Sequence, residues 1–247
     1  GKVPLLADDM MLADLLGLKK RTLYWISNPY IQRESKSNKN GSSVYSFYKV
    51  AKIFKRMGKD GSKKYRYLQI PLNELKYIQD QIFKKIVKYI EFPEYVVGFI
   101  AGKSIVDAAK VHCDKKIVLS IDLERFFESV TQKQIETALM LELNYPKEVS
   151  KIISEIATFR HWLPQGASTS PGLANLVGLH YFDREVKLLA DSYKFAYTRY
   201  ADDLTFSTNE DYKIESVEKS LVLNDKGEEE EILIPRSEVD TFYKKLR

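Results

Sequence analysis

The stretch of sequence that decides the fold is KFAYTRYADDLTFS, residues 194–207. Its residues fall into two strand-like runs, 194–200 and 204–207, which predict two strands joined by a tight turn. Asp202 and Asp203 lie at the tip of this predicted hairpin. Because adjacent aspartates at a turn repel each other, each would be stabilised by an opposite charge nearby.

A third carboxylate follows another predicted strand upstream. Residues 117–121, IVLSI, form a short apolar run that is consistent with a strand buried on both faces, and Asp122 comes directly after it. If this strand and the hairpin lie side by side, a pair of divalent cations would neutralise Asp122, Asp202 and Asp203 together. Each aspartate considered alone has a simpler structural interpretation. Asp122 would cap a turn, and Asp202 and Asp203 would be solvated residues at a hairpin tip.

Composition narrows the class of protein. The chain has 247 residues, 44% of them hydrophobic, which is enough to bury a core in one large or two small units. Its longest apolar runs are far shorter than the roughly 18 residues that span a bilayer, so we expect no membrane segment. A single cysteine, Cys113, excludes an internal disulfide and a zinc ribbon. We therefore expect a reduced, cytoplasmic protein.

The charge is unevenly distributed. The net charge is +5, but residues 49–88 hold twelve basic residues against three acidic ones, whereas Glu228 to Glu231 form an acidic run. A basic segment indicates either a polyanion, such as nucleic acid, or a solvated surface.

Local patterns predict further elements. They predict helices after Asp8 and over 21–27, a hairpin from 44–57 and 65–70, and a helix after Pro71. They also predict a helix from a Thr131–Gln134 capping box to about Leu143, another over 145–159 and a third begun by Ser170-Pro171. Residues 34–43 and 208–227 read as polar, irregular segments.

Three motifs in order resemble those of reverse transcriptases. They are the Tyr-X-Asp-Asp box at 200–203, an aspartate followed five residues later by an aromatic at 122–127, and the sequence LPQGASTSP at 163–171. Finer features resemble retron and related bacterial defence-associated enzymes, over about 64–207. Three features depart from the retron pattern, one of which is that the acidic stretch after Ser207 matches no motif of the family. Residues 108–112, AAKVH, lack the usual asparagine, and no Val-Thr-Gly thumb motif is present.

The resemblance implies an α+β right-hand polymerase fold with fingers and palm. The palm would be an antiparallel sheet backed by helices. We expect the thumb to be missing from this chain. The expected divisions are a helical extension (1–43), fingers (44–115), palm (116–207), and an acidic insertion with the start of a palm helix (208–247). The implied function is RNA-directed DNA synthesis by two-metal nucleotidyl transfer. The implied partners are two Mg²⁺ ions, deoxyribonucleotides, an RNA template and primer with their DNA product, a structured noncoding RNA and an anti-phage effector protein.

The resemblance also implies roles for single residues. Asp122, Asp202 and Asp203 would be catalytic and would bind the metals, with the backbone carbonyl of Leu123. Phe127 would exclude a 2′-hydroxyl, Gln165 and Gly166 would adjoin the incoming nucleotide, and Lys64 and Arg66 would hold its triphosphate. The expected nucleic-acid contacts are Lys84, Lys85, Lys88, His112, Arg199 and Tyr200. A solvated helix face would explain the three lysines equally well, and a structural role would explain His112.

Three alternatives stay open at this point. The chain could be a catalytically inactive polymerase fold that binds RNA or protein. It could also be a related abortive-infection enzyme that makes untemplated DNA, because the same metals and aromatic gate would serve both reactions. A phosphate-ester nuclease would need neither the Gln-Gly box nor the gate.

Overall fold

The computed structural model describes residues 1–28, 34–37, 43–45, 47–57, 61–211, 214–223 and 229–237. The helices are α1 (Asp9–Leu16), α2 (Lys20–Ser27), α3 (Asn73–Lys85), η2 (Val87–Tyr89), α4 (Ile105–Val111), α5 (Phe126–Ser129), α6 (Gln132–Glu142), α7 (Lys147–Ala157), α8 (Ser170–Gly178), η3 (Leu179–Asp183) and α9 (Arg184–Ser192). The strands are β1 (Glu34–Ser37), β2 (Ser43–Tyr45), β3 (Tyr48–Met57), β4 (Lys63–Pro71), β5 (Ile117–Asp122), β6 (Ala196–Tyr200), β7 (Asp203–Thr208), β8 (Ile214–Leu223) and β9 (Glu229–Ser237).

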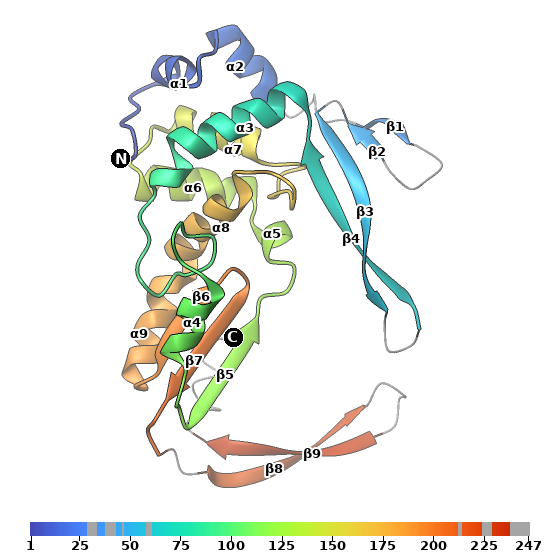
Figure 1. Ribbon diagram of the computed structural model, residues 1–247, viewed down its shortest axis with the longest axis vertical. Coiled ribbons are helices and arrows are strands. Elements are labelled where there is room, and N and C mark those ends of the chain that lie inside the picture. Colours follow the sequence, from blue (N-terminus) through green and yellow to red (C-terminus); the bar gives the residue numbers. More distant parts are fainter. Residues whose placement is uncertain are drawn as a thin grey trace.

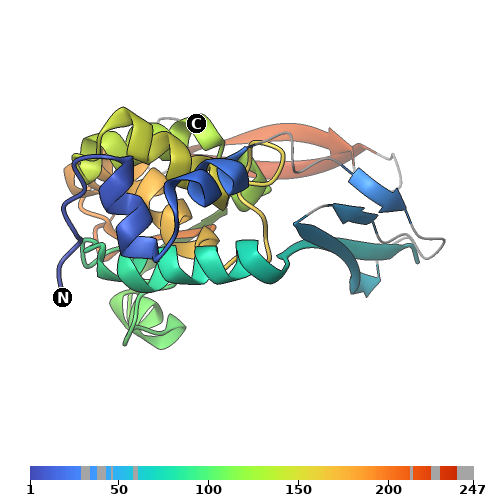
Figure 2. The same cartoon turned by 90° about the horizontal axis from the view of Figure 1, so that it is seen from above.

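The strands form three antiparallel sheets, ordered β1-β2-β3-β4, β5-β7-β6 and β8-β9. The long β3–β4 hairpin projects from a helical body, and α3 continues directly from β4 into that body (Figure 1). Seen from above, the helices gather at one end of the molecule and the hairpins extend from it (Figure 2). Mixed helix and antiparallel sheet confirms the predicted α+β class.

The helical body holds the larger hydrophobic core. Buried residues of α1, α2, α3, α6, α7 and α8 join one cluster with Phe47 and Tyr48. The predicted stripe of α3, Leu75, Ile78 and Ile82, belongs to this cluster and is at most 1% exposed. A second cluster lies between the three-stranded sheet and α9, so the sheet has its own support.

Several local predictions are confirmed. Asp8 caps α1 by accepting a hydrogen bond from the Met11 amide (2.8 Å), and Gly17 ends the helix at φ 71°. Thr131 and Gln134 form the predicted capping box of α6. Within the described residues, no helix is long and apolar enough to cross a membrane.

Three segment predictions are wrong. Strand β5 is not buried on both faces: Val118 is 53% exposed, because alternate side chains of β5 point to a covered face and to an open face of the sheet. Residues 34–37 are strand β1 and residue 43 begins β2, not loop. Residues 214–223, expected to be irregular, are strand β8 paired with β9, since backbone pairing does not require apolar side chains. A palm helix is expected to start within 208–247; residues 238–247 lie outside the described residues, so that start stays a prediction.

Candidate active site

The three aspartates meet at one edge of the β5-β7-β6 sheet. Asp122 ends β5 and Asp203 begins β7, and the two are direct cross-strand partners. The amide of Leu123 donates a hydrogen bond to the carbonyl of Asp202 (2.9 Å), which ties the β5 end to the turn. The side chains of Asp122 and Asp203 are exposed, whereas Asp202 is half-buried. The side-by-side arrangement expected from the sequence is therefore present.

The turn between β6 and β7 is tight and strained. Tyr200 pairs with Asp203, so only Ala201 and Asp202 turn the chain. Ala201 is 6% exposed and has a φ of 58°, in the left-handed region that a residue with a Cβ rarely adopts. A non-glycine residue keeps this conformation only where its surroundings hold it there.

The donor chemistry fits hard divalent cations. Although Asp203 is exposed, neighbouring atoms remove part of the water around its carboxylate, which raises its pKa, and the negative charges of Asp202 and Asp122 raise it further. Repelling carboxylates at one edge indicate that a positive charge belongs between them. Within the described residues, no three carboxylate, histidine or cysteine groups are close enough to enclose one ion alone. Magnesium fits such an open edge, because it commonly takes one or two carboxylates and completes its shell with water and substrate phosphates.

A cavity of about 650 Å³ opens in front of the aspartates. Its walls come from β4, the β5–α5 connection, the segment before α8 and the β6–β7 turn. Of the predicted site residues, the structure brings eight together around this cavity: Arg66, Asp122, Leu123, Phe127, Gln165, Tyr200, Asp202 and Asp203. A basic side chain, an aromatic ring, an amide and a carboxylate edge thus face one space.

Comparison with known proteins gives the family. Residues 55–228 match the model of the reverse transcriptase (RNA-dependent DNA polymerase) family, a span that includes all three aspartates and the cavity. The chain belongs to the reverse transcriptase family.

Curated relatives of this chain include retron reverse transcriptases. It is 30% identical to the retron Se72 reverse transcriptase of Salmonella heidelberg over 214 residues, covering 86% of this chain and 50% of that protein. It is 34% identical to the retron Ec86 reverse transcriptase of Escherichia coli over 170 residues, covering 69% and 51%. It is 32% identical to the retron Mx162 reverse transcriptase of Myxococcus xanthus over 213 residues, covering 79% and 41%. The chain spans about half the length of the curated relatives it matches.

Phe127, Gln165 and Gly166 are held at the cavity by specific contacts. Phe127 packs edge-on against Phe126, with ring centroids 5.8 Å apart, and against Phe99 at 6.0 Å. The backbone N–H of Gln165 donates a hydrogen bond to the side-chain Oε1 of Gln69 in β4 (3.2 Å). Gly166 lies so close to β4 that an added Cβ would be 2.5 Å from the carbonyl oxygen of Gln69. Its lack of a side chain thus serves the contact between this loop and β4.

Other predicted residues lie elsewhere. Lys64 is exposed on β4 and does not line the cavity. On α3 and η2, Lys84 and Lys88 are exposed, whereas Lys85 donates a hydrogen bond to the carbonyl of Leu15 (2.6 Å), at the end of α1. None of these four lysines lines the cavity, and their contact with nucleic acid stays a prediction.

His112 and Arg199 are structural in this conformation. The two ring nitrogens of His112 hydrogen-bond the hydroxyls of Ser207 (2.7 Å) and Thr198 (2.8 Å), and burial lowers its pKa. Arg199 is 0% exposed and forms an ion pair with Asp183. The prediction that Arg199 contacts nucleic acid is wrong for this structure. It failed because the sequence did not show that helical residues cover β6.

Some residues around the cavity were not predicted from the sequence. They include Tyr65, Tyr67, Phe99, Glu124 and Arg125. The two tyrosines flank Arg66 on β4, which also holds Lys64, and Lys55 lies on the paired strand β3. This mixture of aromatic and basic residues was the available signal. No sequence signal indicated that Arg125 lines the cavity, because its position depends on a left-handed φ of 52° just before α5.

Proposed function

We propose that this chain contains the nucleotidyl-transfer centre of a retron-type reverse transcriptase, which extends a primer along an RNA template. The observation that carries the proposal is the meeting of Asp122 and Asp203 as cross-strand partners at the mouth of a cavity that also holds Arg66, Phe127 and Gln165. The division into fingers (44–115) and palm (116–207) is part of the same proposal.

The roles of the chain's own residues follow from this arrangement. Arg66 binds the triphosphate of the incoming nucleotide, because a guanidinium can donate two parallel hydrogen bonds to phosphate oxygens. Phe127 occupies the space that a 2′-hydroxyl would need, so deoxyribonucleotides are preferred. Gln165 adjoins the nucleotide and is held by Gln69 of the same strand–loop contact.

The aspartates supply the metal-binding part of the proposed centre. Asp122 and Asp202, with Asp203 and the Leu123 carbonyl, would hold two magnesium ions. When bound, magnesium supplies Lewis-acid chemistry that favours the primer 3′-oxyanion and the charge of the departing pyrophosphate. The aspartates would place the metal ions at the mouth of the cavity. The left-handed turn at Ala201 fixes the direction of the Asp202 and Asp203 side chains, which follow it in the chain.

The retron-like relatives support the finer proposal. We propose that the template is a structured noncoding RNA, and that the enzyme acts with an effector protein in anti-phage defence. Matched identities of 30% and 34% to retron reverse transcriptases support this. Sequencing the DNA that copurifies with the protein tests it, because a copied noncoding RNA would give one recurrent DNA sequence.

Primer extension by the full-length protein tests the central proposal. The reaction contains an RNA template, deoxyribonucleotides and magnesium, and it is repeated with the double variant Asp202→Asn, Asp203→Asn. The matched control is Asp14→Asn, which changes an exposed aspartate of α1. We expect template-directed DNA from the wild-type protein and from Asp14→Asn, and none from the double variant.

The other outcomes separate the alternatives. DNA made without regard to the template would assign the enzyme to the untemplated class. Folded, metal-replete protein that binds RNA but makes no DNA would show that the fold serves only as a binding module. Either result would contradict the proposal.

A further inference from the structure

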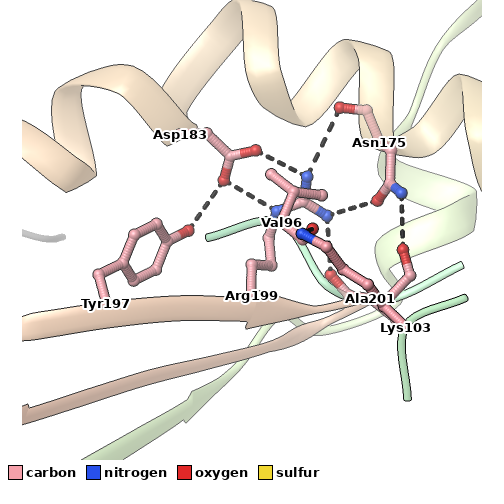
Figure 3. A network of polar contacts seen from close by, with 8 residues as sticks. Val96, Lys103, Asn175, Asp183, Tyr197, Arg199 and Ala201 are labelled. Carbon is pink, nitrogen blue, oxygen red and sulfur yellow. Dashed lines mark hydrogen bonds and ion pairs between the residues drawn. The ribbon is translucent and has the colours of Figure 1, made fainter. Parts of the chain in front are cut away.

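A fully buried ion pair lies beneath the strained turn. Arg199 and Asp183 are both 0% exposed. The guanidinium donates two parallel hydrogen bonds to the carboxylate, Nε to Oδ1 at 2.8 Å and Nη2 to Oδ2 at 2.6 Å (Figure 3). The same guanidinium lies over the rings of Phe126 and Phe182, at 5.9 and 5.6 Å from their centroids. Charge, geometry and packing therefore fix this side chain in one position.

The third guanidinium nitrogen reaches the turn itself. Nη1 of Arg199 donates to the backbone carbonyl of Ala201 at 3.2 Å and to the side-chain oxygen of Asn175 at 2.9 Å. The carbonyl of Ala201 belongs to the peptide that joins Ala201 to Asp202. A hydrogen bond to that carbonyl sets the plane of the peptide, and thus the direction in which the Asp202 side chain leaves the backbone.

The segment before α4 also contacts the turn and its supporting residues. Asn175 donates its side-chain N–H to the carbonyl of Gly98 at 2.8 Å. The amides of Val97 and Gly98 donate to the Arg199 carbonyl, at 2.9 and 3.3 Å. A Cβ on Gly98 would lie 3.0 Å from the Tyr200 carbonyl carbon. One side chain, Asn175, thus joins the segment before α4 to the guanidinium below the turn.

The helix that supplies Asp183 is shaped for this contact. Residues 179–183 form the π-helix η3 between α8 and α9, and a single π-helical turn is rare and frequently found at functional sites. At Gly178, one turn earlier, a Cβ would lie 2.9 Å from Nη2 of Arg199. The absence of a Cβ at Gly178 makes room for the guanidinium, and the π turn that directly follows ends at Asp183.

Stability alone does not explain this arrangement. A buried ion pair contributes little net stability, because removing two charges from water offsets most of their attraction, and apolar residues of similar volume are often as stabilising. What apolar residues cannot do is donate a hydrogen bond to the Ala201 carbonyl. We propose that Arg199, held by Asp183 and Asn175, is a positioning residue that orients the Ala201–Asp202 peptide and thereby the metal-binding carboxylates; this rests on the proposed function.

Three variants of the full-length protein test the proposal. Arg199→Lys keeps a positive charge beside Asp183 but removes the planar group that also reaches Ala201. Asn175→Ala removes the link between Gly98 and the guanidinium while leaving the ion pair intact. Tyr197→Phe is the matched control, because Tyr197 donates to Oδ1 of Asp183 at 2.8 Å from the side of the ion pair that faces away from Asn175 (Figure 3).

The readouts are thermal unfolding, binding of Mn²⁺ followed by electron paramagnetic resonance, and kcat and KM for a deoxyribonucleotide. Loss of a partner behind a metal ligand typically weakens metal affinity or activity about 10- to 100-fold, and we expect Arg199→Lys to lower both Mn²⁺ affinity and kcat within that range, with KM nearly unchanged. Asn175→Ala should change the same two quantities in the same direction. Tyr197→Phe should lower the unfolding temperature while keeping wild-type Mn²⁺ affinity and kcat.

The outcomes separate this proposal from the proposed function. Wild-type Mn²⁺ affinity and kcat in folded Arg199→Lys and Asn175→Ala would overturn the positioning role, and so would an equal loss of Mn²⁺ affinity in Tyr197→Phe. If Arg199→Lys does not fold, Asn175→Ala decides, since it leaves no buried charge unpaired. If the wild-type protein binds Mn²⁺ but extends no primer, the proposed function fails while the Mn²⁺ measurements still decide the positioning role.

Discussion

Adding a methyl group at Gly98 should push the β6–β7 turn out of place. An added Cβ would lie 3.0 Å from the carbonyl carbon of Tyr200, 3.1 Å from its Cα, and closer still to the amide nitrogen of Ala201. Ordinary contact begins near 3.4 Å, and all three atoms are backbone, so no side-chain rotation relieves the overlap. Either the segment before α4 or the turn must move by several tenths of an ångström.

The expected loss of activity follows from that displacement. Because a misplacement of about 1 Å can lower a rate about 100-fold, we expect Gly98→Ala to lower kcat roughly 10- to 100-fold. Overpacking of a tight contact typically costs about 1–3 kcal/mol, so a fall in the unfolding temperature should accompany it. KM for the deoxyribonucleotide should change less than kcat, because Arg66, which binds the triphosphate, stands on β4.

Steady-state primer extension and thermal unfolding measure the two effects separately. The control is Gly102→Ala in the same connection, whose Cβ would meet nothing within 4 Å but would stand at φ 79°. The strain of that conformation costs about 1–2 kcal/mol, so the control loses stability without displacing the turn. Wild-type kcat in folded Gly98→Ala, or an equal loss of kcat in Gly102→Ala, would refute the reasoning.

Three further predictions follow from the site and its surroundings. Phe127→Val should raise the use of ribonucleotides about 10-fold or more, measured as kcat/KM against the matching deoxyribonucleotide; an unchanged ratio would contradict the gate. Since burial and Lys115 lower the pKa of His112, the folded protein should lose stability as the pH falls below 6.5, where the unfolded chain gains a proton. Urea unfolding should show a weaker pH dependence for His112→Gln. Glu142, whose pKa is lowered to about 2 mainly by Arg184, should stabilise the fold by about 1–2 kcal/mol at pH 7 after solvent screening. That advantage over Glu142→Gln should shrink as the pH falls from about 4.5 toward 2, and a constant difference would refute it.

Local chemistry explains why much of the site was predictable. The two strands around Asp202 and Asp203 are short and strongly patterned, and Asp122 follows an apolar run directly. Caps such as Asp8 and Thr131 act within one helical turn, so the sequence defines them completely. Residues 214–223 show the limit: their pairing with 229–237 depends on a partner strand and not on an apolar pattern.

The role of Arg199 shows where sequence reasoning stops. An arginine next to a Tyr-X-Asp-Asp box is predicted to contact nucleic acid, because basic residues next to a polymerase centre commonly bind phosphate. Its burial results from two tertiary facts: α8 to α9 cover one side of β6, and residues 95–98 pair along its edge. Where water is excluded, an unpaired guanidinium would strongly destabilise the fold. Arg199 therefore needs a buried carboxylate beside it, and Asp183 supplies that partner. The same burial that removes Arg199 from the substrate therefore gives it a fixed hydrogen bond to the turn that orients Asp202.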